Sequence, residues 1–214
     1  REWGLGCLRL LDNYIAHDDP SVPDMGEPLA RERWLSATLA PEQVAAAGLP
    51  ELRLVGKVDR LDFDDCLGDS LKGGVQPVCI VDYKTGKPPN LKYSPAMNTK
   101  IRAKSFFQLR CYALLLARGG SDEGGVSTSE SLASTRLRLI YLGGDTNLGA
   151  TSLEDILPLD DLEGELSRVE EEVIRVWGRI AELVRSGDPS AFSHCDRPFC
   201  FCHEARPLVS KWLI

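Results

Sequence analysis

The stretches Gly56-Lys57-Val58-Asp59-Arg60-Leu61-Asp62 and Val81-Asp82-Tyr83-Lys84-Thr85-Gly86 decide the fold expected of this chain. Each closes a run with the apolar, β-branched pattern of a strand, over residues 52–63 and 78–83. Successive side chains of a strand point to opposite faces, so Asp82 and Lys84 are expected on one face and Tyr83 on the other. If the two strands are neighbours in a sheet, Asp59 lies beside Asp82.

Two neighbouring carboxylates form a binding site for a hard divalent cation. Asp59 and Asp82 would supply the oxygen ligands that Mg²⁺ or Mn²⁺ prefers, and the backbone carbonyl of Tyr83 would add another. Such a cation activates water and stabilises negative charge on a phosphate, and Lys84 would assist beside it. The pattern therefore predicts phosphodiester cleavage. The alternative is a structural hairpin that ends in charged residues before a Gly-Pro turn.

The remaining pattern predicts an α/β fold with a small mixed central sheet flanked by helices. The expected elements are helices over 3–16, 105–117 and 162–185, with strands over 33–39, 52–63, 78–83 and 136–142. The Ala-rich stretch around Val44 predicts a short helix. Residues 119–134, rich in Gly, Ser and Glu, are typical of a mobile insertion.

Charge is distributed unevenly along the 214 residues. The net charge of −7 argues against a protein that coats nucleic acid without specificity. Eight of the 25 basic residues nevertheless fall between Lys84 and Arg118, a segment without Asp or Glu. This basic segment predicts either a local phosphate-binding surface or a solvated loop and helix face. No apolar run of about 18 residues occurs, so neither a transmembrane segment nor a membrane partner is expected.

A third motif, Gln108-Leu109-Arg110-Cys111-Tyr112, follows the two strand motifs. Together and in this order they resemble the core motifs of RecB-type nucleases in the PD-(D/E)xK, or restriction-endonuclease-like, superfamily. The resemblance covers residues 30–142 and implies a restriction-endonuclease-like core. It also implies a Mg²⁺- or Mn²⁺-dependent deoxyribonuclease, exonuclease-like, acting in DNA repair, recombination or replication. The residues to which it gives catalytic roles are Asp59, Asp82, Lys84, Gln108 and Tyr112, with Gln108 and Tyr112 bracing the site or contacting a phosphate.

The resemblance further implies DNA, as ends or single strands, as the substrate, and a fused or bound helicase as a partner. We expect an intracellular protein and leave its compartment open, as well as cleavage polarity, exo- or endonuclease action and DNA or RNA preference. The candidate DNA-binding residues are Lys87, Lys100, Arg102 and Lys104. One alternative is a catalytically inactive module of the same fold that binds nucleic acid or a protein. Another is an unrelated metal-dependent hydrolase, which would not explain the Gln-x-x-x-Tyr helix.

The family carries a metal-binding histidine on a helix before the first core strand. The upstream candidate here is His17, for which a solvated position at a helix end is the alternative. Because the chain begins at Arg1 without methionine, we expect a nuclease domain over 1–190 that is truncated at its N-terminus, and we leave open whether the histidine precedes Arg1. Glu32 stands where the family has a glutamate, and we expect a supporting role for it.

Cysteines cluster in the segment 191–214, which we expect to pack on the same domain. Some relatives hold a [4Fe-4S] cluster through three C-terminal cysteines and one on an N-terminal helix. By this resemblance the ligands would be Cys195, Cys200, Cys202 and Cys7. The Cys-x-Cys spacing departs from the usual arrangement. Two alternatives stay open: a zinc site that includes His194 or His203, and reduced thiols without a metal.

Overall fold

The structure is a computed structural model that describes residues 2–18, 27–64, 75–119, 132–144 and 149–188. The chain divides into two compact units, Arg1–Ile174 and Arg175–Ile214, and the boundary falls inside the last helix. The predicted domain boundary near residue 190 stays a prediction. The elements in chain order are α1 (Glu2–His17), β1 (Ala30–Thr38), α2 (Pro41–Ala46), β2 (Arg53–Phe63), β3 (Gln76–Lys84), α3 (Pro95–Arg118), β4 (Leu132–Tyr141), β5 (Thr151–Ile156) and α4 (Leu162–Ser186).

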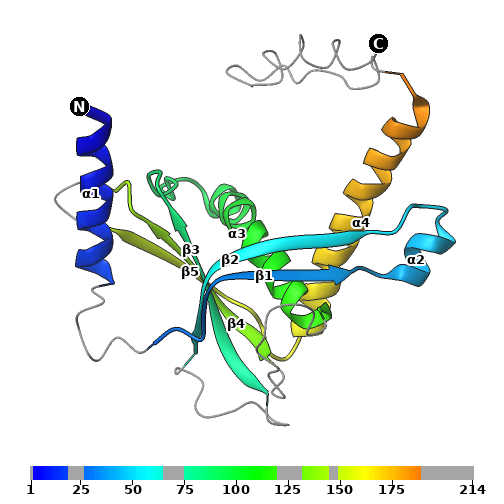
Figure 1. Cartoon of the computed structure of the whole chain (residues 1–214), viewed down its shortest axis with the longest axis horizontal. Coiled ribbons are helices and arrows are strands. Elements are labelled where there is room, and N and C mark those ends of the chain that lie inside the picture. Colours follow the sequence, from blue (N-terminus) through cyan, green and yellow to red (C-terminus); the bar gives the residue numbers. More distant parts are fainter. Residues whose placement is uncertain (1, 19–26, 65–74, 120–131, 145–148, 189–214) are drawn as a thin grey trace. The chain divides into compact units, whose positions relative to one another are not determined.

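Five strands form one mixed sheet in the order β1-β2-β3-β4-β5 (Figure 1). The pairs β1–β2, β2–β3 and β4–β5 are antiparallel, whereas β3 and β4 are parallel. A parallel pair needs a long crossover, which α3 supplies. The carboxyl ends of β3 and β4 therefore lie at the same edge, where Leu142 N donates to Lys84 O at 2.8 Å. The predicted α/β class, with a small mixed sheet flanked by helices, is confirmed.

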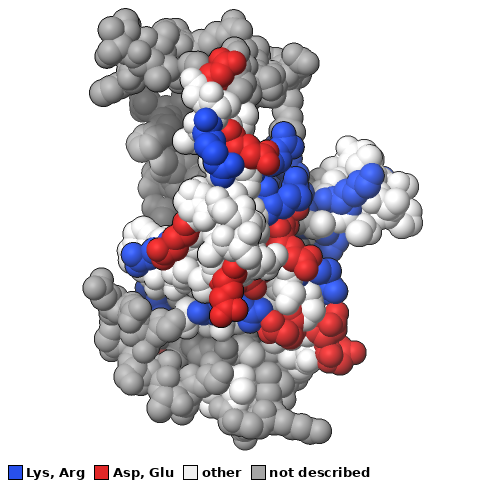
Figure 2. All heavy atoms as spheres, turned by 90° about the vertical axis from the view of Figure 1, so that its right-hand side faces the viewer, with Lys and Arg blue, Asp and Glu red and all other residues white. Residues whose placement is uncertain are grey.

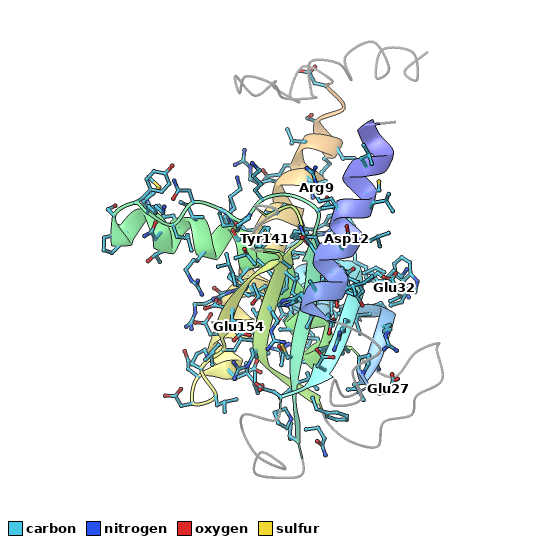
Figure 3. All side chains as sticks on the ribbon, turned by 90° about the vertical axis from the view of Figure 1, so that its left-hand side faces the viewer. Arg9, Asp12, Glu27, Glu32, Tyr141 and Glu154 are labelled. Carbon is cyan, nitrogen blue, oxygen red and sulfur yellow. The ribbon has the colours of Figure 1, made fainter. Side chains whose placement is uncertain are left out.

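The two faces of the sheet are covered by different helices. On one face α3 approaches, and it buries Phe106, Leu109 and Tyr112 at the three- and four-residue spacing of a helix face. On the other face lies a cluster around Cys79, Val81 and Ile140. Because Tyr83 alternates with Lys84, it points to this second face, where α1 lies (Figure 3). Helix α1 thus backs the sheet on the side away from the Lys84 ammonium.

Helix α1 is bound to the sheet mainly by polar and aromatic contacts. The Tyr14 ring meets the Tyr83 ring edge-on at 5.5 Å, and Asn13 Nδ2 donates to Leu142 O at 2.7 Å. The apolar positions that predict this helix face outward instead: they are 48–59% exposed, namely Leu5, Leu8, Leu11 and Ile15. None of the helices in the described ranges combines enough length with enough apolar character to span a bilayer.

Strand β4 begins at Leu132, inside the stretch 119–134 for which the sequence predicts a mobile insertion. Helix α3 and strand β5 differ more strongly from the sequence prediction. Helix α3 begins at Pro95 instead of Ser105, because Ser94 caps it by accepting a hydrogen bond from Met97 N and proline suits the first turn. Strand β5 was not predicted. It is an edge strand whose Glu154 accepts hydrogen bonds from Arg136 at 2.9 Å and Arg138 at 2.7 Å, both on β4. These charge pairs between β4 and β5 stabilise the edge strand.

The β1–β2 register is continuous except at Glu32 and Asp59, which stand opposite each other without forming a ladder pair. Glu32 has a left-handed φ of 51°, which is rare for a residue with a Cβ. The fully buried side chains of β2 are Val58 and Leu61, three positions apart instead of two. The alternation of side chains therefore changes at this point, and Asp59 shares a face with Leu61.

Candidate active site

Asp59 and Asp82 lie side by side on neighbouring strands, as the pattern predicts. The register pairs Arg60 with Val81, so the next positions along the antiparallel ladder are Asp59 and Asp82. Asp59 Oδ2 accepts a hydrogen bond of 2.9 Å from the backbone N of Tyr83, which fixes its carboxylate beside β3. Asp82 is buried and Asp59 is half-buried. The two carboxylates therefore face one partly buried site.

Asp82 is electrostatically unusual. Its burial raises its pKa, the Lys84 ammonium lowers it, and the charge of Asp59 raises it further, with a net shift above the ordinary value. The Lys84 Nζ lies 2.6 Å from Asp82 Oδ2. Within the described part of the chain, this ion pair is the polar contact of the buried Oδ2. A buried carboxylate oxygen in this state is well suited to a cation.

The residues present fit a divalent metal ion. Two adjacent carboxylates, one of them buried, are the hard ligands that Mg²⁺ and Mn²⁺ prefer. Within the described part of the chain, no group of three or more His, Cys, Asp or Glu side chains is placed so that it could hold a metal ion together. The Tyr83 carbonyl stays a predicted further ligand. His17 is exposed at the end of α1, which confirms the solvated alternative for it.

Lys84 is held from the α3 side. Its Nζ donates to Gln108 Oε1 at 3.0 Å, and Gln108 Nε2 donates to the Tyr112 hydroxyl at 2.6 Å. Gln108 and Tyr112 are one helical turn apart, so a single stripe of α3 carries both. Tyr112 is buried, whereas Gln108 is exposed. The structure therefore places Gln108 as a brace for the Lys84 ammonium and Tyr112 as a brace for Gln108.

Gly56 explains how α3 comes close enough to reach Lys84. A Cβ at Gly56 would lie 2.6 Å from Cε1 of Tyr112 and 3.2 Å from Cδ1 of Leu115. Real side chains do not tolerate the first of these distances. The glycine that opens the first strand motif thus makes room for the Tyr112 ring against β2. Sequence reasoning placed Gly56 in the motif without finding this role.

A second polar cluster lies behind Asp82, on the α1 face. Arg60 Nε donates to Asp62 Oδ1 at 2.7 Å, an ion pair within β2. Arg60 also pairs with Asp18, and the Tyr83 hydroxyl donates to Asp18 Oδ2 at 2.9 Å. Burial raises the pKa of Tyr83. Sequence reasoning missed Asp18, because only the fold brings the end of α1 to these strands.

Arginines of the basic segment are bound by acidic residues. Arg110 pairs with Asp155 at 2.7 Å and Glu165 at 2.9 Å, and Arg118 pairs with Glu163 and Glu170. On the face shown in Figure 2, charges of both signs are interspersed. These arginines therefore connect α3 to β5 and to the first turns of α4.

The four candidate DNA-binding residues fall into two groups. Arg102 donates to the Glu154 carbonyl, lies 3.6 Å from Asp155 and stacks over the Phe106 ring at 5.3 Å. Lys87, Lys100 and Lys104 are exposed and have no ion pair with any other described residue. The lysines are thus the members of this set that are available to a phosphate. Their DNA-binding role stays a prediction.

The predicted cysteine site is not brought together by the described residues. Cys7 is a half-buried free thiol on α1. Cys195, Cys200 and Cys202 lie outside the described residues. The iron–sulfur cluster, the zinc site and the metal-free alternative therefore all stay predictions.

Comparison with known families points to the same chemistry. A family model described as the PD-(D/E)XK nuclease superfamily matches residues 9–203, a span that contains all three motifs. No curated protein matches the chain. The family match, together with the mixed sheet flanked by helices, confirms the restriction-endonuclease-like fold. The RecB-type subgroup stays a prediction.

Proposed function

Because the chain belongs to the PD-(D/E)XK nuclease superfamily, we propose that it is a Mg²⁺- or Mn²⁺-dependent deoxyribonuclease whose active site is Asp59, Asp82 and Lys84. The observation that carries the proposal is the buried carboxylate of Asp82, which lies beside Asp59 on the neighbouring strand and whose Oδ2 is 2.6 Å from the Lys84 ammonium. The motif resemblance supports exonuclease-like action on ends or single strands in repair, recombination or replication, beside a helicase.

Each side chain has a defined task in the proposed reaction. Asp59 and Asp82 would hold the cation, which when bound polarises the scissile phosphate and acidifies a water molecule. Lys84 donates hydrogen bonds to the attacking water or to a phosphate oxygen as negative charge develops there. Gln108 keeps the Lys84 ammonium in place through its 3.0 Å contact, and Tyr112 fixes Gln108 in turn. The ammonium is therefore oriented before the substrate arrives.

The direct test is cleavage of end-labelled linear single- and double-stranded DNA with Mg²⁺, with Mn²⁺ and with EDTA. We expect cleavage with either metal and none with EDTA. Asp82→Asn should lower the rate at least about 100-fold, because the cation loses a charged ligand. Asp160→Asn, at an exposed position after β5, should leave the rate unchanged. The product ladder gives the polarity.

Two outcomes would contradict the proposal. Cleavage that persists in EDTA or in Asp82→Asn would remove the metal site from the reaction. A wild-type chain that binds DNA but does not cut it under any metal would favour the inactive nucleic-acid-binding module.

A stripe of α3 supports a path for the DNA strand. Lys100, Lys104 and Gln108 follow each other at four-residue spacing, so the two lysines lie on the face that carries the brace of Lys84. Both lysines are exposed and no described residue forms an ion pair with them. We propose that they bind phosphates of the strand on its way to Lys84.

Removing both charges tests this path. In Lys100→Gln/Lys104→Gln, the dependence of single-strand affinity on salt should flatten by about 0.7 in log–log slope for each lost phosphate contact. Fluorescence anisotropy over a range of salt in EDTA measures it without cleavage. The matched control is Arg31→Gln/Arg53→Gln, which removes two exposed charges from β1 and β2. An unchanged slope in the lysine variant would show that the strand follows another face.

A further inference from the structure

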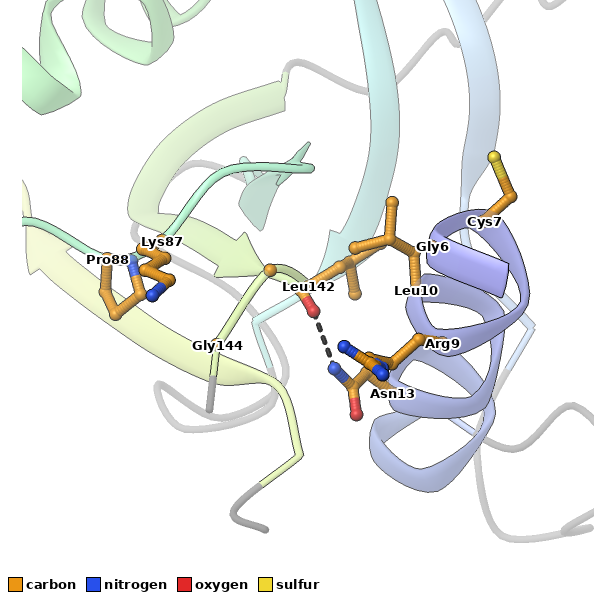
Figure 4. A pocket seen from close by; sticks show the side chains of 10 residues that line it. Gly6, Cys7, Arg9, Leu10, Asn13, Lys87, Pro88, Leu142 and Gly144 are labelled. Atoms are coloured by element: carbon orange, nitrogen blue, oxygen red, sulfur yellow. Dashed lines mark hydrogen bonds between the residues drawn. The ribbon is translucent and has the colours of Figure 1, made fainter. Parts of the chain in front are cut away.

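A pocket with a cavity volume of about 880 Å³ lies between α1 and the segments that follow β3 and β4. Figure 4 shows Lys87 and Pro88 on one side, the α1 residues on the other and Leu142 between them. The volume falls in the range of pockets that bind small molecules, about 300–1,000 Å³. Its lining combines an apolar surface, from Leu10, Pro88 and Leu142, with two cationic side chains.

The charge of the pocket is opposite to that of the chain. Arg9 and Lys87 line it, and no Asp or Glu does, although the chain carries a net charge of −7. Neither cation forms an ion pair with a described residue, in contrast to Arg102, Arg110 and Arg118. Two available cations beside an apolar wall are suited to a ligand with a phosphate and a flat or apolar body. A nucleotide has this chemistry.

The residues on one side of the pocket follow directly after the proposed active-site strand β3. Lys87 comes three residues after Lys84, and Gly143 N donates to Gly86 O at 3.2 Å. Gly143 packs so closely that a Cβ there would overlap the Thr85 carbonyl oxygen. This close packing fixes the pocket wall to the end of β3. Ligands of open α/β sheets bind outside the carboxyl ends of parallel strands, where this pocket lies.

We propose that this pocket is a subsite for a nucleotide of the DNA strand beside the scissile phosphate. Arg9 and Lys87 bind the phosphate of that nucleotide, and Leu10, Pro88 and Leu142 contact its sugar or base. The inference rests on the proposed nuclease function. It gives α1 a role in binding the substrate, although this helix packs on the face of the sheet opposite to α3.

Gly6 offers a way to close the pocket without weakening the helix. It lines the pocket, and a Cβ at this position would meet no heavy atom within 4 Å. A leucine at position 6 therefore extends into open space, and leucine favours a helix more than glycine does. Gly4 is the matched control, because it belongs to the same helix, is equally open and does not line the pocket.

The test is binding of a labelled single strand to the full chain in EDTA, with each phosphate in turn replaced by an uncharged methylphosphonate. Mapping cleavage of the same strand with Mn²⁺ locates the scissile phosphate. In the wild type, neutralising one phosphate beside the scissile one should weaken binding about fivefold or more. Gly6→Leu and Arg9→Gln/Lys87→Gln should bind the unmodified strand more weakly by a similar factor. Both variants should then be insensitive to that one replacement, and Gly4→Leu should match the wild type.

The outcomes separate this subsite from the nuclease function. If the wild type cuts DNA but Gly6→Leu binds as tightly as Gly4→Leu, the pocket is not a nucleotide subsite. The same holds if Arg9→Gln/Lys87→Gln keeps the wild-type response to every methylphosphonate. If the wild type neither binds nor cuts DNA, the proposed function fails and the subsite fails with it.

Discussion

Replacing Lys84 by methionine is expected to lower kcat by about 10²- to 10³-fold, with a much smaller change in DNA affinity. Methionine keeps most of the length and volume of lysine but removes the charge and the donors. The Lys84 Nζ is fixed 2.6 Å from Asp82 Oδ2 and 3.0 Å from Gln108 Oε1, so it is oriented toward the charge that develops in the transition state. Loss of one oriented donor from such a site typically costs this factor.

Arginine should not restore the activity of Lys84→Met. Its planar guanidinium is larger than an ammonium and donates in a fixed fork, whereas the space between Asp82 and Gln108 is shaped for a point charge. Steady-state cleavage of an end-labelled strand with Mn²⁺ measures kcat, and anisotropy in EDTA measures affinity separately. Lys92→Met, at an exposed position of the same basic segment, is the control. If Lys84→Met retained a rate within threefold of the wild type, Lys84 would be a structural counterion of Asp82 only.

The centre of the site could be predicted from local periodicity. Alternation along a strand places Asp82 and Lys84 on one face, and the four-residue spacing on a helix places Gln108 with Tyr112. The pairing of β2 with β3 then brings Asp59 to Asp82. These arguments need only short-range geometry, and the structure shows each of these arrangements.

The supporting contacts could not be predicted, because they depend on residues that are distant in the sequence. The need for glycine at position 56 follows from the approach of Tyr112 on α3. The role of Arg102 depends on Glu154 and Asp155 of β5. The acidic and polar residues of this strand obscure the alternation of apolar and polar side chains by which a strand is predicted. In both cases the local pattern contains no information about the partner.

Helix α1 shows a different limit of sequence reasoning. Its period predicts the helix correctly, but an apolar stripe does not say which face meets the protein. Leu5 and Leu8 are 59% and 57% exposed, whereas the polar Asn13 is buried and donates to Leu142 O. The carbonyl that Asn13 satisfies belongs to the residue just after β4, where the strand has ended. The need of a backbone carbonyl for a hydrogen-bond donor can be recognised only once the arrangement of the strands is known.

Replacing Arg60 by methionine is expected to lower the free energy of unfolding by about 3–5 kcal/mol. Its guanidinium lies between Asp18 and Asp62, whose side chains are 10% and 19% exposed, and its own side chain is 16% exposed. Without the Arg60 guanidinium, the two largely buried carboxylates of Asp18 and Asp62 would lose the cation that pairs with them. Arg60 also lies 3.4 Å from the Tyr83 hydroxyl, so one side chain connects α1, β2 and β3.

Urea unfolding of the full chain measures the effect, and two variants set its scale. Arg31→Met, on the neighbouring strand β1, removes an exposed ion pair with Glu27 and should cost at most about 1 kcal/mol. Tyr83→Phe removes only the hydroxyl that Asp18 accepts from, and should cost about 1 kcal/mol. If Arg60→Met unfolded like Arg31→Met yet lost DNA cleavage, Arg60 would act in the reaction and not in the fold. Because Arg60 points away from Asp59, we expect the opposite: Arg60→Met loses stability first, and the folded fraction at low temperature keeps the rate of the wild type.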